Sequence, residues 1–329
     1  MSELHKFIFD GLPVRGMLVR LTDAWVEILR RHATGSPAGP YPAPVQNMLG
    51  QMVAAASLMQ SNIKFNGALV LQIFGDGPVK FAVAEVQPDF SLRATATING
   101  SIAVDASLSM MVNVSNQGKC AITLDPKTKF PGQQPYQGVV PLFGDAHEKL
   151  ESLSEVLEHY MLQSEQLDTT LVLAADDKVA AGLLIQRLPL EGVGNLAGSL
   201  VSQANEDEIG VNEHYKRIAM LASSLKREEL LTLDTETILR RLFWQEKMTR
   251  FEPLTGDAAP RFACTCSRER VTRMILGLGA AEAQGIVAER GEIEVGCDFC
   301  GVHYRFDPID VARIFTVTGD LPPSSAAVQ

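Results

Sequence analysis

The spacing of apolar side chains predicts three helices in the first half of the chain. In Thr22–His32, apolar residues recur at helical spacing behind a threonine that can cap a helix. A second helix is expected at about Val45–Asn62 and a third at roughly Ala146–Gln163, because each segment has one apolar side. The first two helices are separated by a Pro- and Gly-rich loop, Ala33–Pro44.

Runs of β-branched and small apolar residues predict strands between these helices. Ala68–Phe74 and Val79–Val86 flank a Gly-Asp-Gly-Pro turn, which is typical of adjacent antiparallel strands. Ser109–Val114 and Cys120–Leu124 are interpreted as a second hairpin-like pair. Further strands are expected in Arg93–Ile98 and in both halves of Thr170–Leu188. The pattern therefore predicts an α+β domain built on an antiparallel sheet with packed helices.

The character of the chain changes near Glu191–Glu208, where small and polar residues dominate. From Asn205 to Glu252 the pattern is helical and densely charged, and Asp234 is placed to cap one helix. This stretch has too few apolar residues for its own core, so it must rest on another surface. The predicted organisation is an α+β domain at 1–190, a helical charged linker at 191–255, a small zinc-binding domain at 256–320 and a disordered tail at 321–329.

Four of the five cysteines lie in the last quarter of the chain, as two close pairs. Cys264-x-Cys266 is followed, thirty residues later, by Cys297-x2-Cys300 and a glycine that permits a tight turn. Four thiolates brought together suit a tetrahedral Zn²⁺ with bonds of about 2.3 Å. We therefore predict that these four cysteines bind zinc.

Two other residues bear on this chemistry. His303 follows the second pair closely and is a less favoured substitute ligand. Cys120 lies in a strand-like run and is expected to be a small buried core residue. No Ser/His/Asp or Cys/His catalytic set is apparent, so the sequence favours a protein that is not an enzyme.

Spacing alone leaves the role of the zinc open. A four-cysteine site most often only stabilises a fold. A nucleic-acid-binding ribbon is disfavoured because Pro260–Asp320 carries seven arginines against nine acidic residues. A thiol oxidoreductase is disfavoured because the second pair lies between extended runs and does not open a helix after a strand.

A redox switch is another possible role for the zinc, and it rests on the chemistry of the surrounding residues. Arg261, Arg268 and Arg270 lie beside the first pair and would promote reactive thiolates, and each pair is close enough in sequence to form its own disulfide. Oxidation would expel the metal. A domain of about 60 residues has a small core, whereas structural zinc supplies roughly 10–16 kcal/mol of apparent binding free energy. Loss of zinc should therefore unfold this domain.

Charge and composition narrow the partners and the compartment. The net charge of −10 argues against a partner held through phosphates and against an anionic membrane surface. The longest obvious apolar run, Met52–Met59, has eight residues, far short of the roughly 20 that cross a bilayer. No secretory signal is visible at the N-terminus. We therefore expect a cytoplasmic protein, in a compartment where structural disulfides are rare.

The cysteine motifs and their surroundings resemble a known family. The segments 264–271 and Gly291–Phe306, together with collinear stretches such as Phe9–Gly16, closely resemble the redox-regulated holdase chaperones, the bacterial heat-shock family of about thirty-three kilodaltons. The resemblance covers nearly the whole chain. The departures are a longer loop at Ala33–Pro44 and a long spacer around Gly192–Gly210, and neither touches the cysteine motifs.

The resemblance implies a specific set of states. In the reduced state the family is a quiet monomer whose four cysteines hold zinc. In the oxidised state it forms the disulfides Cys264–Cys266 and Cys297–Cys300, loses zinc, unfolds the small domain and the linker, dimerises and holds unfolding client proteins without ATP. The alternative from another class is a zinc-stabilised regulatory or protein-binding module whose metal is purely structural.

Overall fold

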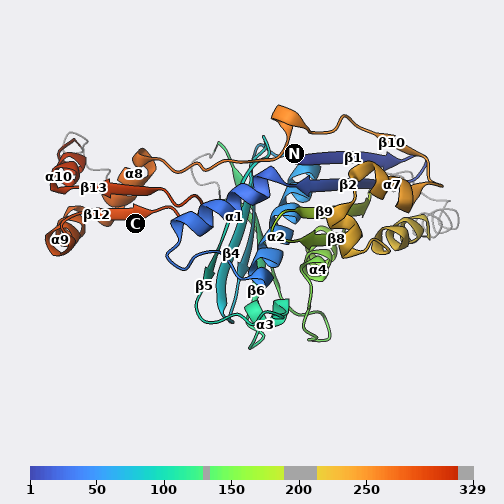
Figure 1. Cartoon of the computed structure of the whole chain (residues 1–329), viewed down its shortest axis with the longest axis horizontal. Helices are drawn as coiled ribbons and strands as arrows, with labels where there is room; N and C mark the ends of the chain where they lie inside the picture. The colour runs from blue at the N-terminus through green and yellow to red at the C-terminus, as the bar shows by residue number, and fades with distance from the viewer. Residues whose placement is uncertain (129–133, 189–212, 318–329) are drawn as a thin grey trace, which may run out of the picture.

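The computed structural model describes residues 1–128, 134–188 and 213–317. Its strands form two large sheets and one small hairpin, and helices pack between and around the sheets (Figure 1). The fold is α+β with largely antiparallel pairing, which confirms the predicted class. The predicted spacer at Glu191–Glu208 and the predicted tail at 321–329 lie outside the described residues.

The first sheet has five antiparallel strands. In order across the sheet they are β10 (Met248–Arg250), β1 (Glu3–Phe9), β2 (Val14–Leu21), β9 (Ala180–Arg187) and β8 (Thr169–Ala175). The edge strand β10 comes from the segment that follows the linker helices. The segment after the linker helices is therefore tied to the N-terminal strand through backbone hydrogen bonds.

The second sheet has six strands. In order they are β11 (Arg261–Phe262), β5 (Ser91–Ile98), β4 (Val79–Val86), β3 (Gly67–Phe74), β6 (Lys119–Pro126) and β7 (Tyr136–Pro141). All neighbours are antiparallel except β11, which pairs in parallel with β5. The residues just before the first cysteine pair are thus part of this sheet. A separate hairpin near the C-terminus joins β12 (Ile293–Gly296) and β13 (His303–Phe306).

The helices fall into three groups along the chain. The first group is α1 (Asp23–Gly35), α2 (Ala43–Asn62), α3 (Leu108–Val112) and α4 (Leu153–Glu165). Residues 213–223 form a helix of the linker, and after it come α6 (Arg227–Thr232), α7 (Thr235–Phe243) and the short 3₁₀ helix η1 (Gly256–Ala258). The C-terminal group is α8 (Arg268–Leu278), α9 (Ala280–Arg290) and α10 (Pro308–Val317). No helix in these described parts of the chain is long and apolar enough to cross a membrane.

Two predicted elements differ from the structure. The predicted strand Ser109–Val114 is wrong, because α3 occupies most of it. Ser107 caps this helix by accepting a hydrogen bond from the Met110 amide, and the Asp76 carboxylate accepts hydrogen bonds from three amides of the loop that follows. The third predicted helix begins only at Leu153, where a reciprocal capping box sets its first turn.

Both faces of the five-stranded sheet are buried, against different partners. In β2, Met17 and Val19 join the main core, whereas Leu18, between them, belongs to the opposite face. The main core lies where α2 packs against strands of both large sheets. The opposite face is covered by the linker helices, whose Ile218 and Phe243 are fully or almost fully buried there. These helices therefore rest on another surface, as their pattern predicted, and that surface is the five-stranded sheet.

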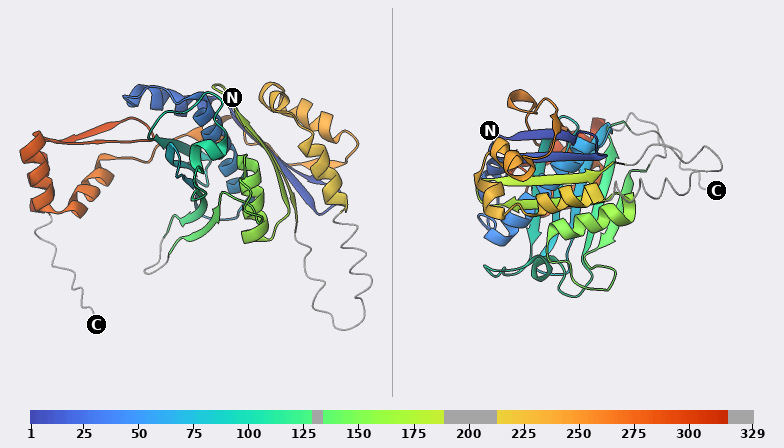
Figure 2. Two further views of the ribbon diagram at one scale, coloured as in Figure 1. Left: turned by 90° about the horizontal axis from the view of Figure 1, so that it is seen from below. Right: turned by 90° about the vertical axis from the view of Figure 1, so that its right-hand side faces the viewer.

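The linker helices and the cysteine region lie at opposite ends of the molecule. Figure 2 shows α8, α9 and α10 projecting from one end, with α6 and α7 packed at the other. The segment from β10 to α8 runs between them along the length of the molecule (Figure 1). A backbone bridge between Leu254 and Leu4 fastens it midway. One stretch of chain therefore connects the two ends.

Candidate metal centre

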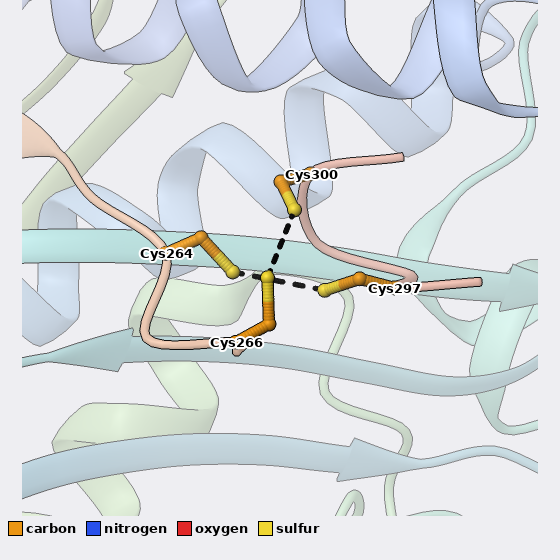
Figure 3. A group of neighbouring side chains, drawn as sticks. All are labelled: Cys264, Cys266, Cys297 and Cys300. Atoms are coloured by element: carbon orange, nitrogen blue, oxygen red, sulfur yellow. Dashed lines mark hydrogen bonds between the residues drawn. The ribbon is translucent and has the colours of Figure 1, made fainter. Parts of the chain in front are cut away.

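The four cysteines predicted to bind metal come from two segments that meet beside β5 (Figure 3). Cys264 and Cys266 lie on the extended segment between β11 and α8, whereas Cys297 and Cys300 lie in the turn between β12 and β13. The turn is closed by hydrogen bonds from the Cys300 and Gly301 amides to the Cys297 carbonyl. Gly301 has a φ of +70°, which glycine adopts without strain.

The four sulfur atoms form a compact cluster. All of them lie within 4.8 Å of one another, and sulfur–sulfur contacts join Cys264 to Cys297 at 3.6 Å and Cys266 to Cys300 at 3.4 Å. A tetrahedron with metal–sulfur bonds of about 2.3 Å has sulfur–sulfur edges of about 3.8 Å. The cluster is thus of the size that one four-coordinate metal ion needs. None of the five cysteines forms a disulfide in this structure.

The cluster is partly shielded from water. Cys300 is buried, and the other three thiols are half-buried. Burial raises the pKa of the Cys264 thiol, but hydrogen bonds from the Cys266 amide and from the neighbouring thiols outweigh it and bring that pKa down to about 7. The Tyr304 hydroxyl donates to the Cys266 sulfur at 3.1 Å. When a cation binds to four thiols so close together, it favours their deprotonation.

The arginine that reaches this cluster is not one that the sequence suggested. Arg268 pairs with Asp310, and Arg270 donates to the Thr265 hydroxyl. Arg93, from β5, instead lies with Nη1 3.9 Å from the Cys264 sulfur. Sequence reasoning missed it because nothing in the local pattern of its strand marks it as part of a site 171 residues away.

The remaining candidates lie outside the cluster. His303 pairs with Glu294, its Nδ1 lying 3.0 Å from Oε1, and is not among the clustered ligands. Cys120 is fully buried in β6, and burial raises the pKa of its thiol to about 12. This confirms the prediction that Cys120 is a buried core residue.

The region around the cluster has a small core of its own. Among the described residues it consists of Val271, Ile275, Ala283, Ile293, Phe306 and Val311. Several apolar residues of its helices are exposed, including Met274, Leu278 and Ile309. A core of this size gives the region limited stability without an additional constraint.

Comparison with known proteins gives matches over nearly the whole chain. A family model described as Hsp33 protein matches residues 2–307. A protein of Chromobacterium violaceum named 33 kDa chaperonin is 42% identical over 314 residues, which cover 95% of this chain and 94% of the relative. A protein of Shewanella woodyi with the same name is 39% identical over 317 residues, covering 96% of each. The crystal structure of the 33 kDa chaperonin (heat shock protein 33 homolog) of Thermotoga maritima shares the fold, with a TM-score of 0.70 over 97% of this chain and 99% of that chain at 20% identity.

Proposed function

The chain belongs to the Hsp33 family, and from this premise we propose that it is a redox-regulated, ATP-independent chaperone of the holdase type. It acts in the cytoplasm under oxidative stress, as a zinc-bound monomer when reduced and as a client-binding dimer when oxidised. One observation carries the proposal: four thiols lie within 4.8 Å of one another in a region with a very small core.

Zinc is the metal that best suits the four cysteines. A donor set made only of sulfur favours zinc or iron–sulfur clusters and disfavours magnesium and calcium, which prefer oxygen. The four cysteines would hold zinc between the segment before α8 and the turn between β12 and β13, and the bound ion would contribute folding free energy. Tyr304, hydrogen-bonded to the Cys266 sulfur, orients this ligand.

Oxidation by a peroxide converts each sequence pair of thiols into one disulfide. One thiolate attacks a peroxide oxygen to form a sulfenic acid, and the other oxygen leaves as water after protonation. The second thiol of the pair then attacks the sulfenic sulfur and releases a second water. Two electrons pass from each pair to one peroxide. The pairing Cys264–Cys266 and Cys297–Cys300 rests on the family resemblance, because the sulfur–sulfur hydrogen-bond contacts in this structure run across the pairs.

Loss of the metal spreads to the linker through the connecting segment. The small core alone does not hold the C-terminal region folded, so β11 leaves β5 when this region unfolds. The same segment holds β10 against β1 and carries the bridge between Leu254 and Leu4. Once it loosens, the linker helices lose their restraint.

The surface beneath the linker is suited to unfolded proteins. Phe7, Phe9, Leu18 and Ile185 lie on the outer face of the five-stranded sheet, and all are buried by the linker helices. Release of these helices exposes this apolar face together with the apolar side of the linker. Exposed apolar surface of this kind binds unfolding chains that would otherwise aggregate.

The rival function is a binding module whose zinc is purely structural, and one experiment separates the two. Reduced, zinc-loaded protein is treated with hydrogen peroxide, and zinc release is measured beside aggregation of a heat-unfolding enzyme. We expect zinc to leave and aggregation to be suppressed only after oxidation. Zinc release without any effect on aggregation would favour the rival.

A further inference from the structure

The metal loop, residues Cys297–Gly301, touches the end of α1 backbone to backbone. A methyl group added at Gly35 would lie 2.5 Å from the Gly301 Cα, and one added at Gly301 would lie 2.8 Å from the Gly35 Cα. Carbon atoms in contact normally stay about 3.5–4.0 Å apart. The approach is therefore possible only because both residues are glycine.

Arg93 contacts both halves of the cysteine cluster at once. Its guanidinium lies over the Phe299 ring, 4.2 Å from the centroid, and Phe299 sits between the two cysteines of the metal loop. Its Nη1 lies 3.9 Å from the sulfur of Cys264, in the other pair. Its Nε and Nη2 donate to the Glu85 carboxylate at 3.0 and 2.6 Å, which fixes the side chain on the sheet. Only 15% of the Arg93 side chain is exposed.

The segment that leads into the first cysteine pair is anchored on the same strand. β11 pairs with β5, and the Ala263 amide donates to the Leu92 carbonyl at 3.1 Å. Beside it, the Arg31 guanidinium of α1 lies over the Phe262 ring, 4.7 Å from the centroid. The N-terminal domain therefore contacts both of the segments that carry the cysteine pairs.

We propose that Gly35, Arg93 and the edge of β5 form an intramolecular docking site that recognises the metal-bound loop and slows zinc release. The contacts on Gly301, Phe299 and Cys264 form together only when the four sulfurs are held in one cluster. By linkage, a surface that prefers the metal-bound loop strengthens metal binding by the same factor. The proposal rests on the proposed function and concerns its regulation: docking sets how easily the metal centre is lost.

Gly35→Ala tests the docking site without substituting any residue of the metal loop. Alanine is favoured over glycine in a helix by up to about 1 kcal/mol, so α1 is not weakened, but the new methyl group pushes Gly301 away. Full-length reduced protein is challenged with the chelator 4-(2-pyridylazo)resorcinol. We expect zinc release roughly 5- to 20-fold faster than in the wild type, the lower part of the roughly 5- to 150-fold range of a typical coupling. Hydrogen exchange in β11 should accelerate as well.

The matched control is Gly285→Ala. It makes the same change inside α9, where an added methyl group meets nothing within 4 Å. This variant should release zinc no faster than the wild type. Equal release rates for Gly35→Ala and the wild type, with α1 intact, would overturn the docking site.

A double-mutant cycle tests the arginine contact separately, should Gly35→Ala not fold. Arg93→Ala and Phe299→Leu should each accelerate zinc release. The double variant should release zinc no faster than the faster of the two single variants, because both substitutions remove the same contact between Arg93 and Phe299. Additive accelerations would contradict the proposal.

The chelator assay uses no oxidant. A wild type that keeps its zinc in peroxide would therefore refute the redox function while leaving the docking site to be judged by these rates.

Discussion

The N-terminal domain and the cysteine region reach their folded states by different means. Among the described residues, the main core of the N-terminal domain joins 44 buried residues, and the cysteine region has six in its core. The first can therefore fold by burying apolar surface. Under the proposed function, the second depends on a link between two segments thirty residues apart, which four sulfurs can supply through one metal ion. A fold that depends on so few atoms can be controlled by chemistry at those atoms.

The linker helices are intermediate between these two regions. They are folded, but their buried residues pack on the outer face of the five-stranded sheet. Their stability therefore depends on packing against the N-terminal domain. A small change in how the connecting segment is held can release the linker without unfolding the main core.

Removal of the first cysteine pair should produce the largest difference in stability between the two regions. In the double variant Cys264→Ser, Cys266→Ser, we expect tight zinc binding to be abolished, because two of four sulfur ligands are gone. Structural zinc contributes about 10–16 kcal/mol, so residues 264–317 should lose protection from hydrogen exchange. The main core should keep its thermal transition. Metal affinity equal to that of the wild type would exclude these cysteines as ligands.

Patterns that depend on local spacing were predictable from the sequence, and contacts across the chain were not. The helices α1 and α2 follow from their apolar sides, and the clustering of four cysteines follows from their pairing along the chain. The strand expected at Ser109–Val114 failed because Asp76, distant in sequence, binds the loop after α3. Arg93 was missed for a similar reason, since its role depends on where the fold places Phe299. The domain boundaries stay predictions.

Loosening the linker should have the next largest effect. Phe243 is 1% exposed and packs against Phe7 and Phe9, with ring centroids 6.1 and 5.1 Å away. Phe243→Ala should cost about 3–5 kcal/mol and free the linker helices in the reduced protein. We expect a hydrophobic dye to bind and client aggregation to fall without oxidant, while zinc is retained.

The neighbouring residue provides the control for the linker variant. Trp244 is 71% exposed, so Trp244→Ala should change stability by no more than about 0.5 kcal/mol and should leave the reduced protein inactive. If Phe243→Ala frees the linker, as seen by hydrogen exchange, but aggregation is unchanged, the face beneath the linker is not the client-binding surface.

Matched core truncations should give a smaller and more local difference. Ile275 and Leu49 are both fully buried, the first in the core of the cysteine region and the second in the main core. Each change to alanine costs about 2–5 kcal/mol. Ile275→Ala should lower the chelator concentration at which the cysteine region unfolds, whereas Leu49→Ala should lower only the urea midpoint of the main core. Equal chelator sensitivity in both variants would contradict a metal-dependent fold.

Substitution of the fifth cysteine, Cys120, should have the smallest effect, because this thiol is a core residue outside the metal-binding cluster. Burial raises the pKa of Cys120 to about 12 from an ordinary value of 9.0, so the folded state keeps the thiol protonated where the unfolded state would ionise it. The buried, protonated thiol therefore contributes its full stability to the folded state below about pH 9. This contribution is lost as the pH rises from there towards 12, because ionisation of the thiol then favours the unfolded state. Cys120→Ala should therefore cost roughly 1 kcal/mol at pH 7 and show a shallower loss of stability above pH 9 than the wild type. Unfolding by urea at pH 7, 9 and 10 measures this difference, and zinc release and client protection should be unchanged. A change in either would mean that Cys120 belongs to the redox chemistry.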